Sequence, residues 1–181
     1  MKSFIYPEMM VHVPVCTNKT PKSVLIISNN ANPLLIEMEK HSDISATVVA
    51  CSLDALRDLA EKSYDVVISE MAGDSAIVAH INRIIKEDGQ LSIVHDSLDE
   101  THANKILMQV LGNYFKVIMP YNIGNGTTAL LASKEYHPTA DIILQRADML
   151  DGLKYYNCDI HVASFAMPNY IRKEYLGIIR N

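Results

Sequence analysis

The sequence has few cysteines, no long apolar run and no basic cluster. Its three cysteines, Cys16, Cys51 and Cys158, are far apart and form no C-x-x-C pair, so buried thiols are favoured over metal ligands. No apolar run reaches the roughly 18 residues that a membrane span needs. Residues 1–20 lack the basic start and apolar core of a signal peptide. We therefore expect a cytoplasmic protein with no metal site and no membrane contact.

Positive charge is also scarce. The chain has 16 Lys and Arg against 21 Asp and Glu, a formal net charge of −5, and the basic residues are scattered. Because phosphate contacts need clustered Lys and Arg, we expect no nucleic-acid partner. With 181 residues and 49% hydrophobic content, the chain suits one globular domain spanning residues 1–181.

Short runs rich in valine and isoleucine alternate with helical patterns. The runs cover residues 23–27, 46–51, 65–69 and 90–94. They lack strict period-two alternation, which is typical of strands buried on both faces of a parallel sheet. Helices are predicted from Asn32 to near His41, from Ser52 or Asp54 to Lys62, from Asp74 to Lys86 and from Asp99 to Leu111. This order predicts right-handed βαβ units and a Rossmann-like, doubly wound α/β sheet.

The last two strand patterns, at residues 114–119 and 127–133, leave no room for a helix between them. The linking sequence PYNIGNG suits a loop, so the two strands should pair antiparallel. A parallel sheet ending in such a hairpin is the architecture of the S-adenosylmethionine-dependent methyltransferases, although a fold alone does not decide the chemistry.

In such a sheet the ligand lies beyond the carboxyl ends of the first strands. Here that position carries ISNNANP, at residues 27–33, where a nucleotide-binding loop would have glycines. Asparagine tolerates left-handed backbone, but its side chain occupies space that a ligand would need. We expect Asn30 and Asn32 to leave a pocket smaller than the roughly 300 Å³ of a typical small-molecule site.

Four motifs resemble those of the polyamine aminopropyltransferases, the spermidine synthases. FIYPEMMVHVP (4–14) looks like that family's entry into its catalytic domain, and KYYNCDIHVASFAMP (154–168) looks like its closing motif. YDVVISE (64–70) and MPYNIGNG (119–126) are similar to two internal motifs. The likeness runs from Phe4 to the C-terminus and is nearest to the atypical members from Helicobacter- and Campylobacter-like bacteria.

The resemblance implies transfer of an aminopropyl group from decarboxylated S-adenosylmethionine to a diamine such as putrescine. By matched position it implies that Glu70 is the catalytic carboxylate and that Tyr6 contacts the substrate. Tyr121, one residue away from the family's hairpin tyrosine, would help to hold the amine. The remaining implied contacts are Asp74 as a second diamine ligand and Asp54, Ser28 and Asn30 on the co-substrate.

The chain also departs from the family pattern. Pro7 replaces a His or Gln that contacts the nucleoside, and SNNANP replaces a glycine-rich loop. Between His41 and Asp54 the chain is shorter by about one β-α unit, and the carboxylate that would hold the ribose is lost with it. The chain begins almost at the first motif, so the family's N-terminal β domain is expected to be missing.

Simpler roles compete with several of these assignments. Glu70 is as readily an exposed loop carboxylate as a catalytic group, and Asp74 is favoured as a helix N-cap. Tyr155 and Tyr156 are favoured as packing residues with bonded hydroxyls, and His161 as a hydrogen-bonded core histidine. Asp96 is catalytic only if it faces the same cleft, and helix capping is favoured.

Three functional hypotheses follow. The first is an aminopropyltransferase with a remodelled site, completed by a partner subunit. The second is a non-catalytic binding or interaction protein that kept the fold without the cofactor site. A methyltransferase is disfavoured, because such an enzyme needs the same missing glycine loop. We also expect a homodimer, since FIYPEMM would leave apolar residues exposed unless it packed on a neighbour.

Overall fold

In the computed structural model, which describes residues 2–181, the chain forms six strands and eight helices. The strands are β1 (Ser23–Ile27), β2 (Ser45–Val49), β3 (Tyr64–Ser69), β4 (Ile85–Val94), β5 (Val117–Asn122) and β6 (Thr128–Ser133). The helices are α1 (Ile5–Thr17), α2 (Asn32–Met38), α3 (Leu53–Arg57), α4 (Ser75–Ile84), α5 (Thr101–Leu111), α6 (Leu144–Asp148), α7 (Cys158–Ser164) and α8 (Asn169–Glu174).

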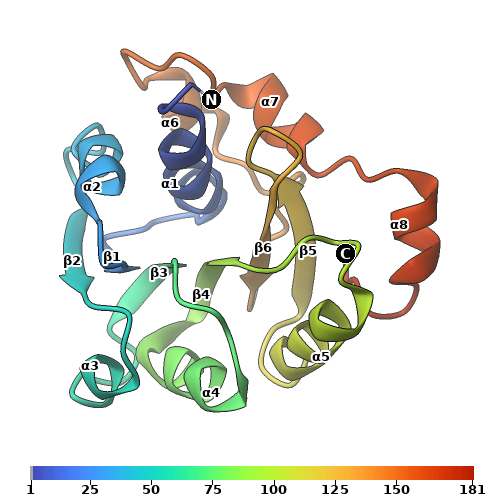
Figure 1. Ribbon diagram of the computed structural model, residues 1–181. Helices are drawn as coiled ribbons and strands as arrows, with labels where there is room; N and C mark the ends of the chain where they lie inside the picture. Colours follow the sequence, from blue (N-terminus) through green and yellow to red (C-terminus); the bar gives the residue numbers. More distant parts are fainter. Residues whose placement is uncertain (1) are drawn as a thin grey trace.

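All six strands belong to one sheet, in the order β2-β1-β3-β4-β6-β5 (Figure 1). β1 runs parallel to both β2 and β3, and β3 runs parallel to β4. β6 runs antiparallel to β4 and to β5. The predicted doubly wound sheet and its C-terminal antiparallel hairpin are therefore confirmed.

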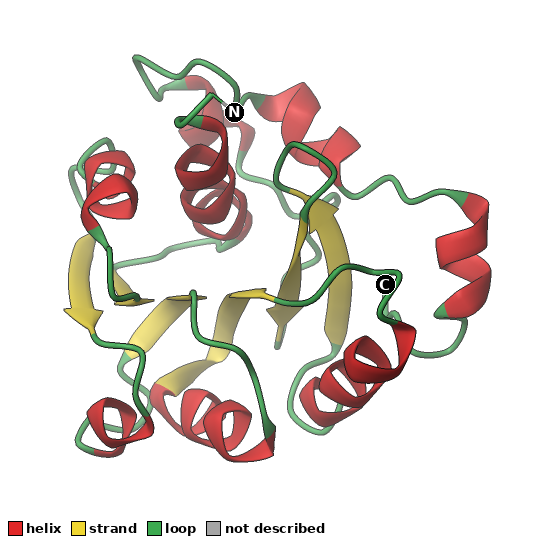
Figure 2. Cartoon of the chain, in the orientation of Figure 1, coloured by secondary structure: helices red, strands yellow, loops and turns green. Residues whose placement is uncertain are grey.

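Helices cover both faces of the sheet (Figure 2). One core packs α3, α4 and α5 on one face of the sheet, with contributions from α8. The other core packs α1, α2 and the α6–α7 region on the opposite face. The central strands contribute alternate side chains to the two cores, which explains why their sequences lack a polar face. No helix among residues 2–181 is both long and apolar enough to cross a bilayer.

Two helix starts follow from side-chain caps. Ser52 Oγ accepts a hydrogen bond from Ala55 N at 3.2 Å and begins α3. Asp74 Oδ1 accepts one from Ile77 N at 2.9 Å and begins α4, as the N-cap interpretation predicted. Both helices end earlier than the sequence suggested, at Arg57 and Ile84. α4 stops there because the backbone enters β4 at once.

Helix α1 was not predicted, and it shows that the N-terminal segment is part of the core. Its residues 7–17 are all buried, between the sheet and the segment around α6 and α7. A helix that is apolar on every side lies inside a protein and shows no amphipathic pattern, which is why the sequence gave no helical signal. Within FIYPEMM, residues 7–10 are buried inside the chain itself and Phe4, Ile5 and Tyr6 are half-buried, so most of this segment is covered without a neighbouring molecule, and the homodimer stays a prediction.

One buried carboxylate joins α1 to the C-terminal region. Glu8, 1% exposed, accepts hydrogen bonds from the backbone N–H groups of Lys154, Tyr155 and Tyr156 at 2.8–3.0 Å. A charge that accepts three N–H groups is well compensated in the interior. The contact fixes the N-terminal end of α1 above the carboxyl ends of the strands.

Candidate functional site

The chain reverses its winding between β1 and β3. α2 follows β1 on one face of the sheet, and α4 follows β3 on the other. The loops after these two strands therefore diverge and leave a crevice at their carboxyl ends, which is where open α/β sheets bind ligands. Ser28 follows β1 directly and Glu70 follows β3 directly.

Tyr6, Ser28 and Glu70 meet at this crevice. The Tyr6 hydroxyl donates to Glu70 Oε1 at 2.7 Å. Ser28 Oγ donates to Glu70 Oε2, and the backbone N–H of Asn30 donates to Ser28 Oγ at 2.9 Å. Three positions singled out in the sequence, on α1 and on two loops, thus form one connected network.

Burial controls the protonation of this network. Burial of the Tyr6 ring, followed by its hydrogen bond to Glu70, raises the pKa of Tyr6 above its ordinary value. The phenol therefore stays protonated and acts as a donor. Each oxygen of an ionised carboxylate has a second lone pair, so Glu70 can still accept a proton or bind an ammonium group.

Glu70 also lines a cavity of about 250 Å³ between the ends of β3 and β4. Asp96 also lines it, with Gly73, His95 and Asn104 among the other residues. No lysine or arginine lines the cavity, so its two carboxylates favour a small cationic ligand. The volume falls below the roughly 300 Å³ expected of a nucleoside-sized pocket.

His95 is held neutral in this cavity. Asn104 Nδ2 donates to three backbone carbonyls, so its Oδ1 must accept the proton of His95 Nδ1 at 2.8 Å. His95 Nε2 then accepts from Thr128 Oγ1 at 2.9 Å. Burial lowers the pKa of His95, in agreement with an uncharged ring. A cation in the cavity would therefore meet no opposing charge from this histidine.

A larger hollow of about 510 Å³ lies at the amino ends of the strands, away from this network. Two of its lysines are already paired, Lys62 with Glu87 at 2.6 Å and Lys116 with Glu135 at 2.7 Å. Arg83 and Lys134, which also line it, donate to backbone carbonyls. Among the residues described, no group of three or more His, Cys, Asp or Glu is arranged to hold a metal ion.

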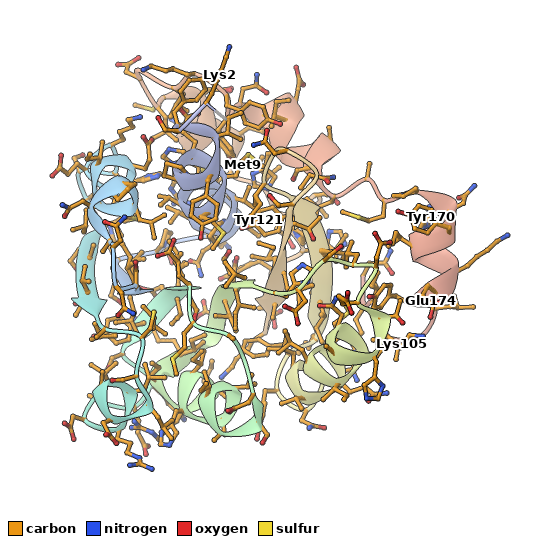
Figure 3. The ribbon with its side chains drawn as sticks, in the orientation of Figure 1. Lys2, Met9, Lys105, Tyr121, Tyr170 and Glu174 are labelled. Atoms are coloured by element: carbon orange, nitrogen blue, oxygen red, sulfur yellow. The ribbon has the colours of Figure 1, made fainter. Side chains whose placement is uncertain are left out.

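Tyr121 and Asp74 lie apart from the Glu70 network. Tyr121 is 0% exposed, and its hydroxyl is 2.6 Å from Ser92 Oγ in the interior (Figure 3). It supports the site from within the core and does not face the cavity. Asp74 caps α4 and is exposed.

The residues implied for the co-substrate are also dispersed. Asp54 is exposed and pairs with Arg57 of the same helix at 2.7 Å. Asn30 contributes its backbone N–H to the network, while its side chain is exposed. Asn32 is exposed as well, so the expected filling of a pocket by Asn30 and Asn32 does not occur.

Sequence reasoning missed two features of this edge. Asn29 Oδ1 accepts a hydrogen bond from Cys51 N at 2.9 Å and ties the loop after β1 to the loop after β2. Asp96 does not cap α5, which begins at Thr101 after Glu100, and instead lines the cavity with Glu70. The asparagine-rich loop after a buried strand was the only signal for the first feature.

The core roles favoured for two aromatic side chains are confirmed. Tyr156 is 3% exposed and its hydroxyl is 2.7 Å from His161 Nδ1. His161 Nε2 lies 3.0 Å from the carbonyl of Pro138. The polar atoms of both side chains are therefore hydrogen-bonded in the interior, and neither side chain takes part in the Glu70 network.

Comparisons with known proteins point to one group of enzymes. The spermine/spermidine synthase domain matches residues 3–65. The polyamine aminopropyltransferase of Helicobacter acinonychis is 27% identical over 203 aligned residues, which cover 95% of this chain and 78% of that protein. The corresponding protein of Clostridium beijerinckii is 28% identical over 225 aligned residues, covering 97% of this chain and 79% of that protein.

Solved structures agree with this likeness. Spermidine synthase from Thermotoga maritima superposes with a TM-score of 0.83 at 26% identity, covering 97% of this chain and 75% of that one. A spermidine synthase in complex with the transition-state analogue AdoDATO gives a TM-score of 0.82. Alignments of up to 226 residues exceed the 181 residues of the chain, so these relatives contain segments with no counterpart here. In this structure β2 is the only strand between His41 and Asp54.

Proposed function

From the premise that this chain belongs to the spermidine synthase family of polyamine aminopropyltransferases, we propose that it transfers an aminopropyl group from decarboxylated S-adenosylmethionine to a diamine such as putrescine. The observation that carries the proposal is the Tyr6–Glu70–Ser28 network at the carboxyl ends of β1 and β3, beside a cavity with a second carboxylate. Glu70 is the group that touches the reacting amine in this proposal.

The diamine presents an ammonium group at each end. Glu70 binds one end and Asp96 the other, because both carboxylates line a cavity without lysine or arginine. Neutral His95 adds no repulsion. Tyr6 and Ser28 orient the Glu70 carboxylate by donating one hydrogen bond to each of its oxygens, which is how a carboxylate is held for proton transfer.

The transfer step needs a free amine. Glu70 takes a proton from the nearer ammonium, and the freed nitrogen lone pair attacks the carbon attached to the sulfonium. A carbon–nitrogen bond forms as the carbon–sulfur bond breaks, and the bonding pair leaves with sulfur as a neutral thioether. The positive charge passes from sulfur to the new secondary ammonium. Alignment of the amine with the sulfonium carbon is the main contribution of the site.

A specific observation favours the alternative, a non-catalytic protein of the same family. The Asn29–Cys51 hydrogen bond joins the two loops between which a nucleoside would lie. Asp54, the residue implied near the adenine, is paired with Arg57 and exposed. The amine end of the site is thus better preserved than the nucleoside end.

Product analysis tests the proposal. The purified chain is incubated with decarboxylated S-adenosylmethionine and putrescine, and methylthioadenosine and spermidine are measured by mass spectrometry. Formation of both products in equal amounts is expected. Absence of both at high enzyme concentration would overturn the catalytic proposal.

Calorimetric titration with methylthioadenosine separates the two alternatives. An enzyme should bind this product with a micromolar dissociation constant, roughly −8 kcal/mol. No heat at millimolar ligand would identify a protein that has lost the nucleoside site.

A further inference from the structure

The turn between β5 and β6 lies against the first residue of α1 (Figure 1). A Cβ atom added to Gly124 would lie 2.5 Å from Ile5 Cγ2 and 3.6 Å from Ile5 Cβ. Carbon atoms in contact normally lie about 3.5–4.0 Å apart, so the turn comes this close only because Gly124 has no side chain. The residue after Ile5 is Tyr6, whose hydroxyl donates to Glu70 Oε1 at 2.7 Å.

Hydrogen bonds hold this turn in place. Gly124 has a φ of +91°, which a residue with a Cβ rarely adopts. Its carbonyl accepts hydrogen bonds from Thr127 N at 3.0 Å and Thr127 Oγ1 at 2.7 Å, and Ile123 N donates to Thr127 O at 3.0 Å. Just before the turn, Asn122 Nδ2 donates to Ser164 O at 2.9 Å and ties the end of β5 to α7. These contacts oppose any displacement of the turn.

The facing part of α1 is stiff as well. Cγ2 of Ile5 is attached directly to the branched Cβ, and a β-branched side chain in a helix keeps one strongly preferred χ1 rotamer. The side chain therefore cannot swing away from the turn without strain. Three residues further on, the buried Glu8 carboxylate accepts three backbone N–H groups of the C-terminal region. Contacts with Gly124 and through Glu8 thus fix the first turn of α1, which carries Tyr6, at two points.

The same hairpin also contacts the cavity beside Glu70. Thr128, the first residue of β6, donates its hydroxyl to His95 Nε2 at 2.9 Å. His95 lines the cavity together with Glu70. The hairpin therefore connects the helix that carries Tyr6 with the wall of the cavity.

We propose that Gly124 is a positioning residue, whose bare backbone, packed against Ile5, sets the distance from the Tyr6 hydroxyl to Glu70. Its role in catalysis rests on the proposed function, aminopropyl transfer, whereas its effect on the Tyr6–Glu70 contact can be measured without turnover. A side chain at position 124 would press on Ile5 and move the phenol of Tyr6. A displacement of about 1 Å near the reacting groups can cost about 10²-fold in rate.

Two alanine substitutions in the same turn isolate the contact. Gly124→Ala adds a Cβ that meets Ile5, whereas Gly126→Ala adds one at a φ of +74° with nothing within 4 Å. Both changes put alanine at a positive φ, so the shared backbone strain cancels in the comparison. Gly124→Ala should lower kcat by about tenfold or more with little change in the KM for putrescine, and Gly126→Ala should leave both near wild type. In a Tyr6→Phe chain, which lacks the hydroxyl, Gly124→Ala should cause no further loss of kcat.

A change at Ile5 tests the same contact from the other side. Ile5→Ala removes Cγ2 and leaves space that the added Cβ of Gly124→Ala would fill. The double variant Ile5→Ala/Gly124→Ala should therefore regain most of the kcat that Gly124→Ala loses. Ile5→Val is the matched control, because valine keeps the branched Cβ, and it should give no such recovery.

Carbon-13 NMR of the Glu70 carboxyl group measures the contact without turnover. Glu70→Gln identifies the signal by its loss, and Tyr6→Phe shows the shift caused by removal of the phenol donor. Gly124→Ala should move the signal toward its Tyr6→Phe position, and Gly126→Ala should not. Ile5→Ala alone should also move it, so the proposal stays testable if Gly124→Ala fails to fold.

An unchanged Glu70 signal in Gly124→Ala, or equal changes in the two glycine variants, would overturn the positioning role. A wild-type chain that forms no product would instead overturn the proposed function, and the carbon signal would still decide the role of Gly124.

Discussion

Glu70 and Asn29 stand just beyond neighbouring strands of one sheet, and their side chains are used in opposite ways. Glu70 receives two hydroxyl donors and still faces a cavity that it shares with Asp96. Asn29 uses its amide oxygen to bind the backbone of Cys51 and so joins two loops of the protein to each other. The part of the site proposed for the amine therefore keeps acceptors available for a ligand, whereas the part proposed for the nucleoside satisfies its polar groups internally.

Removing the charge of Glu70 should have the largest effect, a loss of catalytic rate. We expect Glu70→Gln to lower kcat by about 10²-fold or more, because the amide cannot accept the ammonium proton. Glu135→Gln, the same change at an exposed residue paired with Lys116, serves as the control. Steady-state measurement of methylthioadenosine release checks the result, and equal rates for the two variants would contradict the role of Glu70.

Acid should lower the free energy of unfolding through two buried histidines at the contact between α1 and the α2 region. α1 carries Tyr6 and His12, and α2 follows the loop that carries Asn29. His12 Nε2 lies 2.9 Å from Glu37 Oε2, and His12 Nδ1 lies 3.0 Å from His41 Nε2. Burial lowers the pKa of His12, and burial, with the positive charges of His12 and Arg146, lowers the pKa of His41 to about 3.

The sign of the pH dependence follows from these shifts. Unfolded histidines take up protons below their ordinary pKa of about 6.5, while the folded ones resist protonation. The stability that His41 contributes is therefore fully present above about pH 6.5 and is lost as the pH falls toward about 3, by about 1.4 kcal/mol per pH unit, and His12 changes stability in the same direction. Denaturant titrations between these pH values should show this slope. His41→Asn should flatten it, whereas His102→Asn, at an exposed residue of α5, should not.

Neutralising Asp96 should weaken diamine binding more than it slows the chemistry. In the proposed reaction Asp96 holds the far ammonium group, so Asp96→Asn should raise the KM for putrescine by about tenfold, which corresponds to about 1.4 kcal/mol. Its kcat should change much less. A loss confined to kcat, with KM unchanged, would assign Asp96 a different role.

Opening the nucleoside half should have the smallest effect. Asn29→Gly removes the contact with Cys51, and Asn30→Gly removes a second side chain from the same loop. We expect at most a few-fold gain in methylthioadenosine affinity, because no ribose carboxylate is restored. Each glycine should also lower stability by up to about 1 kcal/mol. Calorimetry and thermal unfolding of the double variant, beside wild type, measure both; a gain of 100-fold would show that this loop alone blocks the nucleoside.

The sheet was largely predictable because its signals are local. The strand at residues 23–27 was placed with its observed bounds, since a run of β-branched residues between polar loops allows few alternatives. The hairpin followed from the short link between β5 and β6. Helix α1 was missed because burial on all sides removes the amphipathic pattern, and because Pro14 lies inside it.

The site was only partly predictable, because side-chain direction depends on tertiary contacts. Matched position singled out Tyr6 and Glu70, and the structure brings the Tyr6 hydroxyl within 2.7 Å of Glu70 Oε1, although the helix that carries Tyr6 was not predicted. Tyr121 was expected in the loop after a strand at residues 114–119, but β5 runs from Val117 to Asn122, and its pleat turns the Tyr121 hydroxyl toward Ser92 in the core. Asp54 lies in the first turn of α3, where it pairs with Arg57 on the exposed side of the helix.

The contact of Glu8 with Lys154, Tyr155 and Tyr156 has a consequence for how the chain is made. These residues are up to 148 positions apart in sequence. During synthesis from the N-terminus, α1 emerges from the ribosome long before the segment that neutralises its buried carboxylate. Until residue 156 has been released, Glu8 has no compensating N–H groups, and the apolar α1 lacks part of its cover. We therefore expect the nascent protein to complete its folding only after nearly the whole chain has left the exit tunnel.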